Sequence, residues 1–232
     1  MKKTILFLLA LFAPLCVFAQ VEFLRYYDIE NVASEKLEYR DGFLMEDEID
    51  NSDYETCRIF FCGDFSFSYY YAKKSGNENA IKINGQTFVT GDEMCQEFDA
   101  YRIRDGGKTY FVLAGYAAAA RFVRFFYIFD ITDTNAIRFY KMVSDLFFAY
   151  QRDENFFGRY KNRLCFFAIT DRWRAGLHKK DDGIPLYYIA PYFIDGDELK
   201  EFAEDGKQHR VYFDFDFSGE KGVHNITRNF EK

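Results

Sequence analysis

The sequence is short of the features by which many enzymes and nucleic-acid-binding proteins are identified. It has no glycine-rich phosphate loop, no HExxH or GxSxG motif and no CxxC pair, and its three histidines, His178, His209 and His224, lie far apart. We therefore predict no catalytic residue, and we expect the histidines on the surface or in polar loops. Basic residues are outnumbered, 30 against 37 acidic, which argues against a nucleic-acid partner because nucleic acids bind basic faces.

Proline and low-complexity sequence are also scarce. The chain has only three prolines and one tryptophan, whereas it has 29 phenylalanines and 18 tyrosines, so that 21% of its residues are aromatic. A chain this rich in aromatic side chains has ample apolar surface to bury, which excludes intrinsic disorder.

The first residues have the pattern of an export signal. Lys2 and Lys3 precede an apolar run from Thr4 to Phe18, and we predict cleavage after Ala19. Lipid attachment at Cys16 is the alternative, which the large Leu15 before it disfavours. The predicted location is the periplasm, the cell surface or the medium of a bacterium.

Removal of the leader, residues 1–19, shortens the chain from 232 to 213 residues. That length suits a single β-rich domain over residues 20–232. Loss of Lys2 and Lys3 changes the formal net charge from −7 to −9. An acidic surface of this kind is compatible with a basic protein partner.

The tract from Thr109 to Asp133 is the longest apolar stretch after the leader. After Arg121 its odd positions form one continuous apolar face and its even positions are largely apolar, which predicts a strand covered on both faces. With the run from Tyr110 to Leu113 it forms a predicted hairpin, connected by Gly115–Ala120. A helix over Ala114–Phe126 is the alternative, because alanine favours helices. The run is too short to span a membrane.

Period-two alternation recurs along most of the chain and predicts strands. The clearest hairpin has Asn84-Gly85 at its turn. Three further expectations concern short segments: a hairpin turn at Asp41-Gly42, an edge strand or bulge at Pro191, and a short helix over Asp195–Asp205.

These patterns predict an all-β fold, mainly antiparallel, with at most one or two short helices. We expect a β-sandwich or a propeller-like meander, and α+β is the alternative class. The segment FDITDTNAIRFY, from Phe129 to Tyr140, resembles blade connections in bacterial β-propellers. That resemblance covers 12 residues and identifies no family.

Four cysteines remain after the leader is removed, and an exported protein can pair them in two disulfides. The candidates are Cys57, Cys62, Cys95 and Cys165. Cys57 and Cys62 lie on one predicted strand, roughly 16 Å apart and on opposite faces, too far for a bridge to each other. Buried thiols are the alternative state, because cysteine is common in cores.

Two groups of acidic residues are candidate sites. Five carboxylates gather in a short stretch that is either a solvated loop or a surface for a basic partner: Glu46, Asp47, Glu48, Asp50 and Asp53. Asp214, Asp216 and Ser218 place oxygens at alternate positions before Gly219, which resembles a degenerate calcium loop of an EF-hand or of an integrin-type propeller repeat. Asn225 stands where an EF-hand has its bidentate glutamate, and Gly222 stands where propeller loops often have a further aspartate. An ordinary acidic strand end is the alternative. No other cofactor is predicted.

The function predicted from these observations is that of a non-enzymatic binding protein of the cell envelope, an immunity-type partner of a basic protein being its concrete form. The alternative is a carbohydrate-active or calcium-dependent carbohydrate-binding module that uses Asp214 and Asp216, with a glycan as partner. A face of Ser66, Ser68 and Tyr70 is a further candidate binding surface. Asp171–Gly183 is predicted to be a long polar loop, and it carries the only tryptophan.

Overall fold

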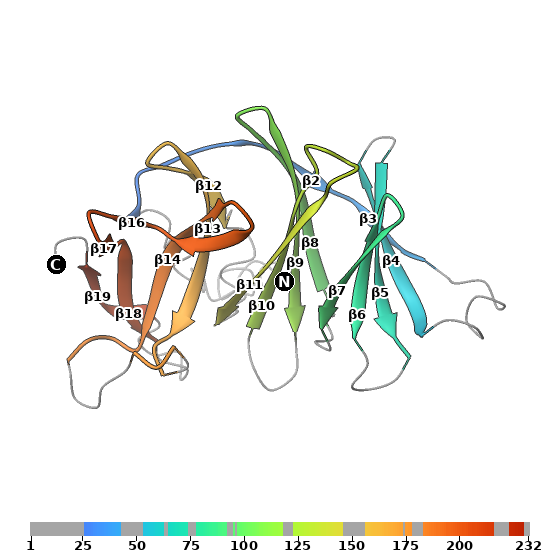
Figure 1. The fold of residues 1–232 in the computed structure, drawn as a ribbon. Coiled ribbons are helices and arrows are strands. Elements are labelled where there is room, and N and C mark those ends of the chain that lie inside the picture. Colours follow the sequence, from blue (N-terminus) through green and yellow to red (C-terminus); the bar gives the residue numbers. More distant parts are fainter. Residues whose placement is uncertain are drawn as a thin grey trace, which may run out of the picture.

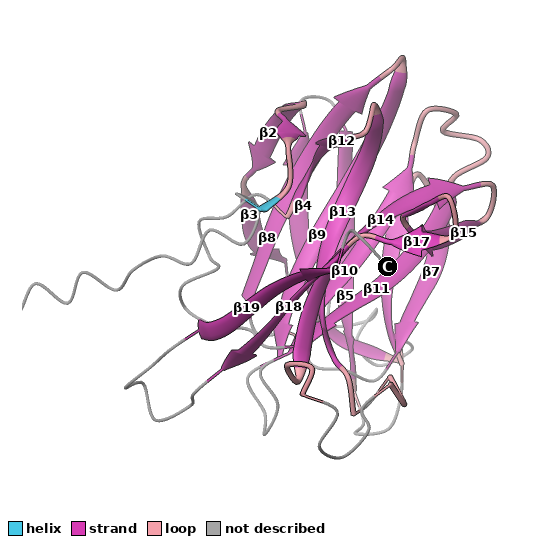
Figure 2. Ribbon diagram, turned by 90° about the vertical axis from the view of Figure 1, so that its left-hand side faces the viewer, coloured by secondary structure: helices cyan, strands magenta, loops and turns pink. Residues whose placement is uncertain are grey.

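The computed structural model of the chain consists of antiparallel β-strands joined by turns and loops (Figure 2). It describes residues 26–42, 53–62, 65–73, 78–91, 95, 97–117, 123–145, 156–173, 175–177, 183–215 and 223–229. No α-helix occurs among these residues, so the all-β prediction is confirmed. The predicted leader lies outside the described residues.

Three sheets contain almost all of the strands. The amino-terminal sheet has the order β3 (Tyr39–Gly42), β4 (Tyr54–Cys62), β5 (Phe65–Ala72), β6 (Asn79–Ile83), β7 (Gln86–Gly91). The middle sheet has the order β11 (Arg138–Asp145), β10 (Val123–Asp130), β9 (Lys108–Ala117), β8 (Glu97–Asp105), β2 (Ala33–Leu37).

The carboxy-terminal sheet has the order β1 (Ile29–Glu30), β12 (Phe157–Tyr160), β13 (Arg163–Asp171), β14 (Tyr187–Asp195), β18 (Arg210–Phe215), β19 (Val223–Asn229). In addition β15 (Glu198–Glu201) pairs with β14. A separate two-stranded hairpin is formed by β16 (Ala203–Glu204) and β17 (Lys207–Gln208). Each large sheet thus contains a meander of four consecutive strands, β4–β7, β8–β11 or β12–β15, and the three lie side by side from right to left in Figure 1.

The middle sheet is buried on both faces, as the sequence of its central strand predicts. Phe125, Tyr127 and Phe129 of β10 pack in one core cluster with side chains of the amino-terminal sheet, such as Phe67. Phe126 and Ile128, at the intervening positions, pack in a second cluster with the carboxy-terminal sheet, including Phe166. A strand between two sheets must be apolar on both sides, which explains the unbroken hydrophobic run in the sequence.

The far face of the carboxy-terminal sheet has a core of its own. Phe167, Ile189 and Phe213 lie on it, and Tyr27 from the start of the described chain and Phe202 pack against them. The Tyr27 hydroxyl lies 2.7 Å from the Ile189 carbonyl oxygen. This third core anchors the amino-terminal end of the described chain.

The segment from residue 29 to residue 42 runs across the whole stack and adds an edge strand to every large sheet (Figure 1). Its first strand, β1, pairs with β12, its second, β2, pairs with β8, and its third, β3, pairs with β4. We call this segment the strap. Among the described residues, the strap is the one stretch that is hydrogen-bonded to all three sheets.

Three local expectations are wrong: a turn, a helix and the edge position of Pro191. Asp41 and Gly42 form no turn but belong to β3, where a Cβ at Gly42 would lie 2.6 Å from the Cys57 sulphur. The predicted helix over residues 195–205 is instead the turn between β14 and β15, with Gly196 at φ +64°, followed by strands. Its acidic residues reflect exposure rather than a helix N-terminus.

Pro191 lies in an inner strand rather than at an edge. Along one edge β14 pairs with β13 throughout. Along its other edge β14 pairs with β18 before Pro191 and with β15 after it. The Pro191 carbonyl accepts a hydrogen bond from the Phe202 N–H, 2.8 Å, at this change of partner. The missing proline N–H is therefore tolerated because no ladder partner faces it there.

Candidate functional site

The residues of the predicted calcium loop are only partly described. Asp214 lies on β18, and its two carboxylate oxygens accept hydrogen bonds from the Leu186 N–H, 2.9 Å, and the Asn225 amide, 3.0 Å. Asp216 and Ser218 lie outside the described residues. Within the described ranges no cluster of three or more His, Cys, Asp or Glu side chains suited to a metal ion occurs. The calcium loop stays a prediction, and Asp214 ties a loop to its own sheet.

Of the five clustered acidic residues, only Asp53 is described, and it is exposed. The cysteines Cys57, Cys95 and Cys165 are buried thiols in the structure, on β4, before β8 and on β13. The structure thus holds these three as thiols, the alternative state named above, and the side chain of Cys62 lies outside the described residues.

His209 differs from the expectation that it would be on the surface. Only 6% of it is exposed, and its Nδ1 atom lies 2.7 Å from the Tyr160 hydroxyl. Its Nε2 atom lies 3.8 Å from a Glu204 carboxylate oxygen. Burial lowers the pKa of the His209 imidazole, and the Glu204 carboxylate acts in the opposite direction.

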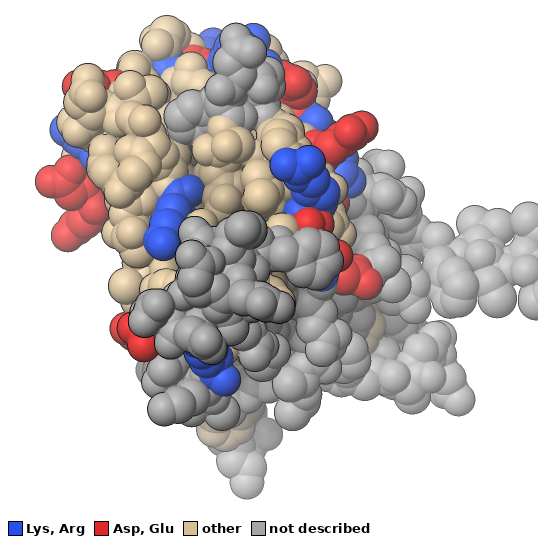
Figure 3. All heavy atoms as spheres, turned by 90° about the vertical axis from the view of Figure 1, so that its right-hand side faces the viewer, with Lys and Arg blue, Asp and Glu red and all other residues tan. Residues whose placement is uncertain are grey.

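The predicted Ser66, Ser68 and Tyr70 face lies on the side of the amino-terminal sheet away from the middle sheet, opposite the buried Phe67 and Tyr69. Figure 3 shows this side of the molecule: its described part is largely uncharged, with basic side chains within it and acidic ones at its margins. The Lys82 ammonium lies 4.4 Å from the centre of the Tyr70 ring on this face. Nothing in the described residues identifies a ligand or partner for this face.

A partly buried polar cluster that the sequence did not reveal lies at one end of the middle sheet. Asp99 accepts hydrogen bonds from the Lys36 ammonium, 2.7 Å, and the Tyr116 hydroxyl, 2.5 Å, and the Arg124 guanidinium lies 3.7 Å away. Burial would raise the pKa of Asp99, but these three neighbours outweigh it and lower the pKa. The cluster allows Arg124 to lie between aromatic rings in the core, a structural role.

The predicted long loop with the only tryptophan contains the most distinctive surface feature. It connects the end of β13 to the start of β14, below these strands in Figure 1. Its described residues are 171–173, 175–177 and 183–186, and we call them the Trp173 loop.

Arg172 holds the Trp173 loop together from within. Only 4% of Arg172 is exposed. Its guanidinium donates hydrogen bonds to the carbonyl oxygens of Leu177, 3.0 Å, Ile184, 2.8 Å, and Pro185, 3.1 Å. These acceptors lie on both arms of the loop, so one side chain ties the outgoing arm to the returning arm. A planar group with five N–H donors in a fixed fork suits this task.

Backbone hydrogen bonds fix the same turn. The Arg172 N–H donates to the Leu186 carbonyl, 2.9 Å, and the Leu177 N–H donates to the Arg172 carbonyl, 2.9 Å. The Trp173 N–H donates to the Asp171 carboxylate, 2.8 Å. With the Asp214 bond to Leu186 described above, both ends of the loop are anchored to the carboxy-terminal sheet.

The Trp173 loop presents large apolar side chains to solvent. Trp173 is 62% exposed, Ile184 45% and Leu177 40%. Exposing three such side chains on one loop costs hydration free energy, and a loop held by a buried arginine loses little entropy when it binds. Tryptophan is also among the residues that contribute most at protein interfaces. The arrangement therefore suits binding rather than reaction chemistry.

Comparison with known proteins finds no family model, curated protein or solved structure that matches the chain. Within the part of the chain that the structure describes, there is no helix with the length and apolar character needed to cross a bilayer.

Proposed function

We propose that the chain is a non-enzymatic binding protein, secreted or periplasmic, of the bacterial cell envelope, and that the Trp173 loop is its contact with a protein partner. The observation that carries this proposal is the exposure of Trp173, Leu177 and Ile184 on a loop whose two arms Arg172 links by hydrogen bonds. The export pattern at the amino terminus supports the location.

A basic protein is the partner that the charge favours. The formal net charge of −7, or −9 after loss of Lys2 and Lys3, attracts a cationic protein over distances longer than contact. An immunity-type role, in which the chain neutralises a basic toxin, combines such steering with an apolar anchor. If so, the association rate falls as salt is added, whereas the dissociation rate depends on Trp173.

The test is a pull-down with the chain from Gln20 onward, from envelope extracts and culture fluid of the source bacterium, read by mass spectrometry. It is run in parallel with Trp173→Ala and with Val89→Ala, a matched control because Val89 is also an exposed apolar residue, 50% accessible, but lies on β7. We expect one stoichiometric partner, kept by Val89→Ala and lost with Trp173→Ala.

The expected loss can be given a size. Truncation of a central tryptophan at an interface lowers the binding free energy by about 2 kcal/mol or more, which raises the dissociation constant about thirtyfold. The absence of any protein partner, or a partner that Trp173→Ala retains at full affinity, would contradict the proposal.

A further inference from the structure

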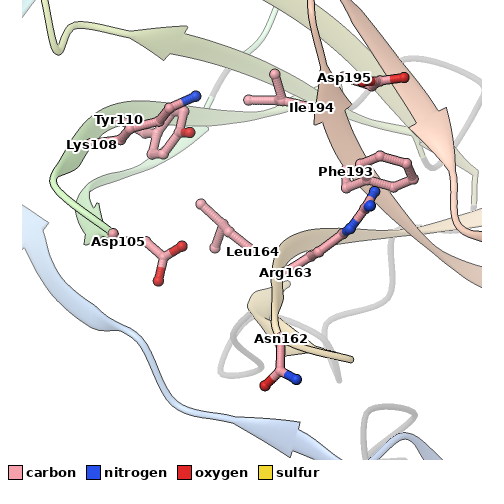
Figure 4. Close-up of a pocket in the computed structure, with 10 residues that line it drawn as sticks. Asp105, Lys108, Tyr110, Asn162, Arg163, Leu164, Phe193, Ile194 and Asp195 are labelled. Carbon is pink, nitrogen blue, oxygen red and sulfur yellow. The ribbon is translucent and has the colours of Figure 1, made fainter.

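A second candidate site lies at the other end of the same strands. Residues from three hairpins, β8–β9, β12–β13 and β14–β15, line a cleft of about 380 Å³ (Figure 4). β13 runs from Arg163 at the cleft to Asp171 at the Trp173 loop, and β14 returns from Tyr187 to Asp195. The cleft therefore belongs to the middle and carboxy-terminal sheets together, and it is remote from the Trp173 loop.

The floor of the cleft is apolar. Tyr110, Leu164 and Ile194 line it, and they belong to the core between the middle and carboxy-terminal sheets. Figure 4 shows Leu164 near the centre, with Tyr110 across from it. Burial, together with the nearby carboxylates of Asp130 and Asp105, raises the pKa of the Tyr110 hydroxyl, which keeps its proton and can donate a hydrogen bond.

The rim is densely charged but balanced. The carboxylates of Asp105 and Asp195 are matched by the Lys108 ammonium and the Arg163 guanidinium, and the Asn162 amide, in the turn between β12 and β13, offers both a donor and an acceptor. A cleft with equal numbers of each sign gives no net attraction for an anion or a cation. It favours a ligand that is neutral overall.

The charged rim groups already have neighbours, two of them outside the cleft and one, Phe193, within its lining. Asp105 forms an ion pair with Arg159, and Asp195 accepts a hydrogen bond from Lys200, 2.7 Å. The Arg163 guanidinium lies 4.5 Å from the centre of the Phe193 ring. These contacts fix the directions in which donors and acceptors point, and a site fixed in advance binds with a smaller entropy cost.

The ligand must match three features at once: a neutral charge, alternating donors and acceptors at the rim, and an apolar floor. A sugar ring meets all three, because each hydroxyl group both donates and accepts hydrogen bonds and the C–H groups of one ring face are apolar. An apolar ligand would remove water from the charged rim groups without replacing the hydrogen bonds that water makes to them, which is costly. A ligand of one charge would meet a like charge on one side of the rim.

We infer that this cleft is a binding site for a neutral glycan, with the sugar ring on Tyr110, Leu164 and Ile194 and its hydroxyl groups bonded to Asp105, Asn162 and the other rim groups. The inference does not rest on the proposed function, since the protein-binding loop is at the opposite ends of the strands. Glycan and protein can therefore be bound at the same time.

Isothermal titration calorimetry of the chain from Gln20 onward tests this site with defined probes. The probes are four neutral tetrasaccharides, cellotetraose, maltotetraose, chitotetraose and mannotetraose, together with tetragalacturonate as an anion and dialanine as a zwitterion. We expect saturable binding of at least one neutral tetrasaccharide at millimolar or lower concentration, and none of the anion or the zwitterion.

Variants then locate the site. Tyr110→Phe and Lys108→Ala each remove one hydrogen-bonding group, so each weakens binding about fivefold. Leu164→Trp fills the floor and abolishes binding. Lys207→Ala is the matched control, because Lys207 is an exposed lysine of β17 that does not line the cleft. Thermal unfolding of each variant verifies that it is folded. If Leu164→Trp does not fold, Tyr110→Phe and Lys108→Ala are sufficient to locate the site.

Three results overturn the inference. They are no saturable binding of any neutral tetrasaccharide, preferential binding of tetragalacturonate or dialanine, and tetrasaccharide binding that the cleft variants leave unchanged. None of these results bears on the Trp173 loop, because its test measures a protein partner.

Discussion

Replacement of Arg172 by lysine should loosen the Trp173 loop while the positive charge is retained. A lysine ammonium at this buried position can reach one of the carbonyl oxygens that Arg172 binds, but not acceptors on both arms of the loop. Two hydrogen bonds from a charged donor are then lost. Such bonds contribute about 1.5 kcal/mol or more each.

The net loss is smaller than that sum, because water can replace the donor where the loop is exposed. Leu177 and Ile184 are exposed, so their carbonyls can be rehydrated, whereas Pro185 is buried. We therefore expect Arg172→Lys to lower the free energy of unfolding by about 2 kcal/mol, measured by urea denaturation.

Trp173 reports the local effect directly, because it is the only tryptophan in the chain. Time-resolved fluorescence anisotropy should show a larger fast component in Arg172→Lys than in the wild type. The matched control is Arg104→Lys, since Arg104 is an exposed arginine of β8. Unchanged anisotropy together with a stability loss below about 0.5 kcal/mol, the range of ordinary surface substitutions, would refute the idea that Arg172 orders this loop.

Two further predictions concern the core. The pKa of His209 is lowered by burial, so the folded protein binds its proton less readily than the unfolded chain: the stabilisation is complete above the unfolded pKa of about 6.5 and is lost as the pH falls below it. Urea denaturation at about pH 7 and about pH 5 should show a larger loss for the wild type than for His209→Gln, and equal losses would contradict this. Gly115→Ala should lower the free energy of unfolding by about 2 kcal/mol, because its Cβ would lie 2.5 Å from the Cys95 sulphur. Thermal unfolding should show that Cys95→Ala reduces this effect, and strictly additive losses would argue against the contact.

The strands were predictable where a local pattern decides them. The two apolar faces of β10 follow from alternate positions in the sequence, and Asn84 and Gly85, both at positive φ, form the expected turn between β6 and β7. In both cases neighbouring residues carry all the information. The connector predicted at Gly115–Ala120 is shorter, because β9 continues to Ala117 and Gly115 makes room for Cys95.

The misassigned elements depend on residues far apart in the chain. A side chain at position 42 would collide with Cys57. Pro191 is tolerated because the pairing partner of β14 changes there from β18 to β15. Neither neighbour can be identified from local sequence. The acidic residues around Phe202 indicated a helix. Phe202 instead lies between β15 and β16 and packs in a core with Tyr27, which is far away in the sequence.

The candidate site was visible in part. The loop and its tryptophan could be predicted from composition, but the role of Arg172 could not, because arginine in a polar loop normally indicates a solvated side chain. The signal present in the sequence is the position of Arg172 directly before the lone tryptophan. The cleft could not be predicted, because its residues come from three hairpins that only the folded stack brings together.

The strap imposes an order on folding. It is made before each of its partner strands, because β1 pairs with Tyr160, β2 with Ala100 and β3 with Phe60, and the partner of β1 is made long after β1 itself. Until the strap pairs with it, each of β12, β8 and β4 has an open edge, which is prone to pair with other chains. The meanders can form in sequence from local contacts, and the strap adds hydrogen bonds across three sheets that also share two core clusters. The strap is therefore completely paired only after β12 has been made, although it precedes all three meanders in the sequence.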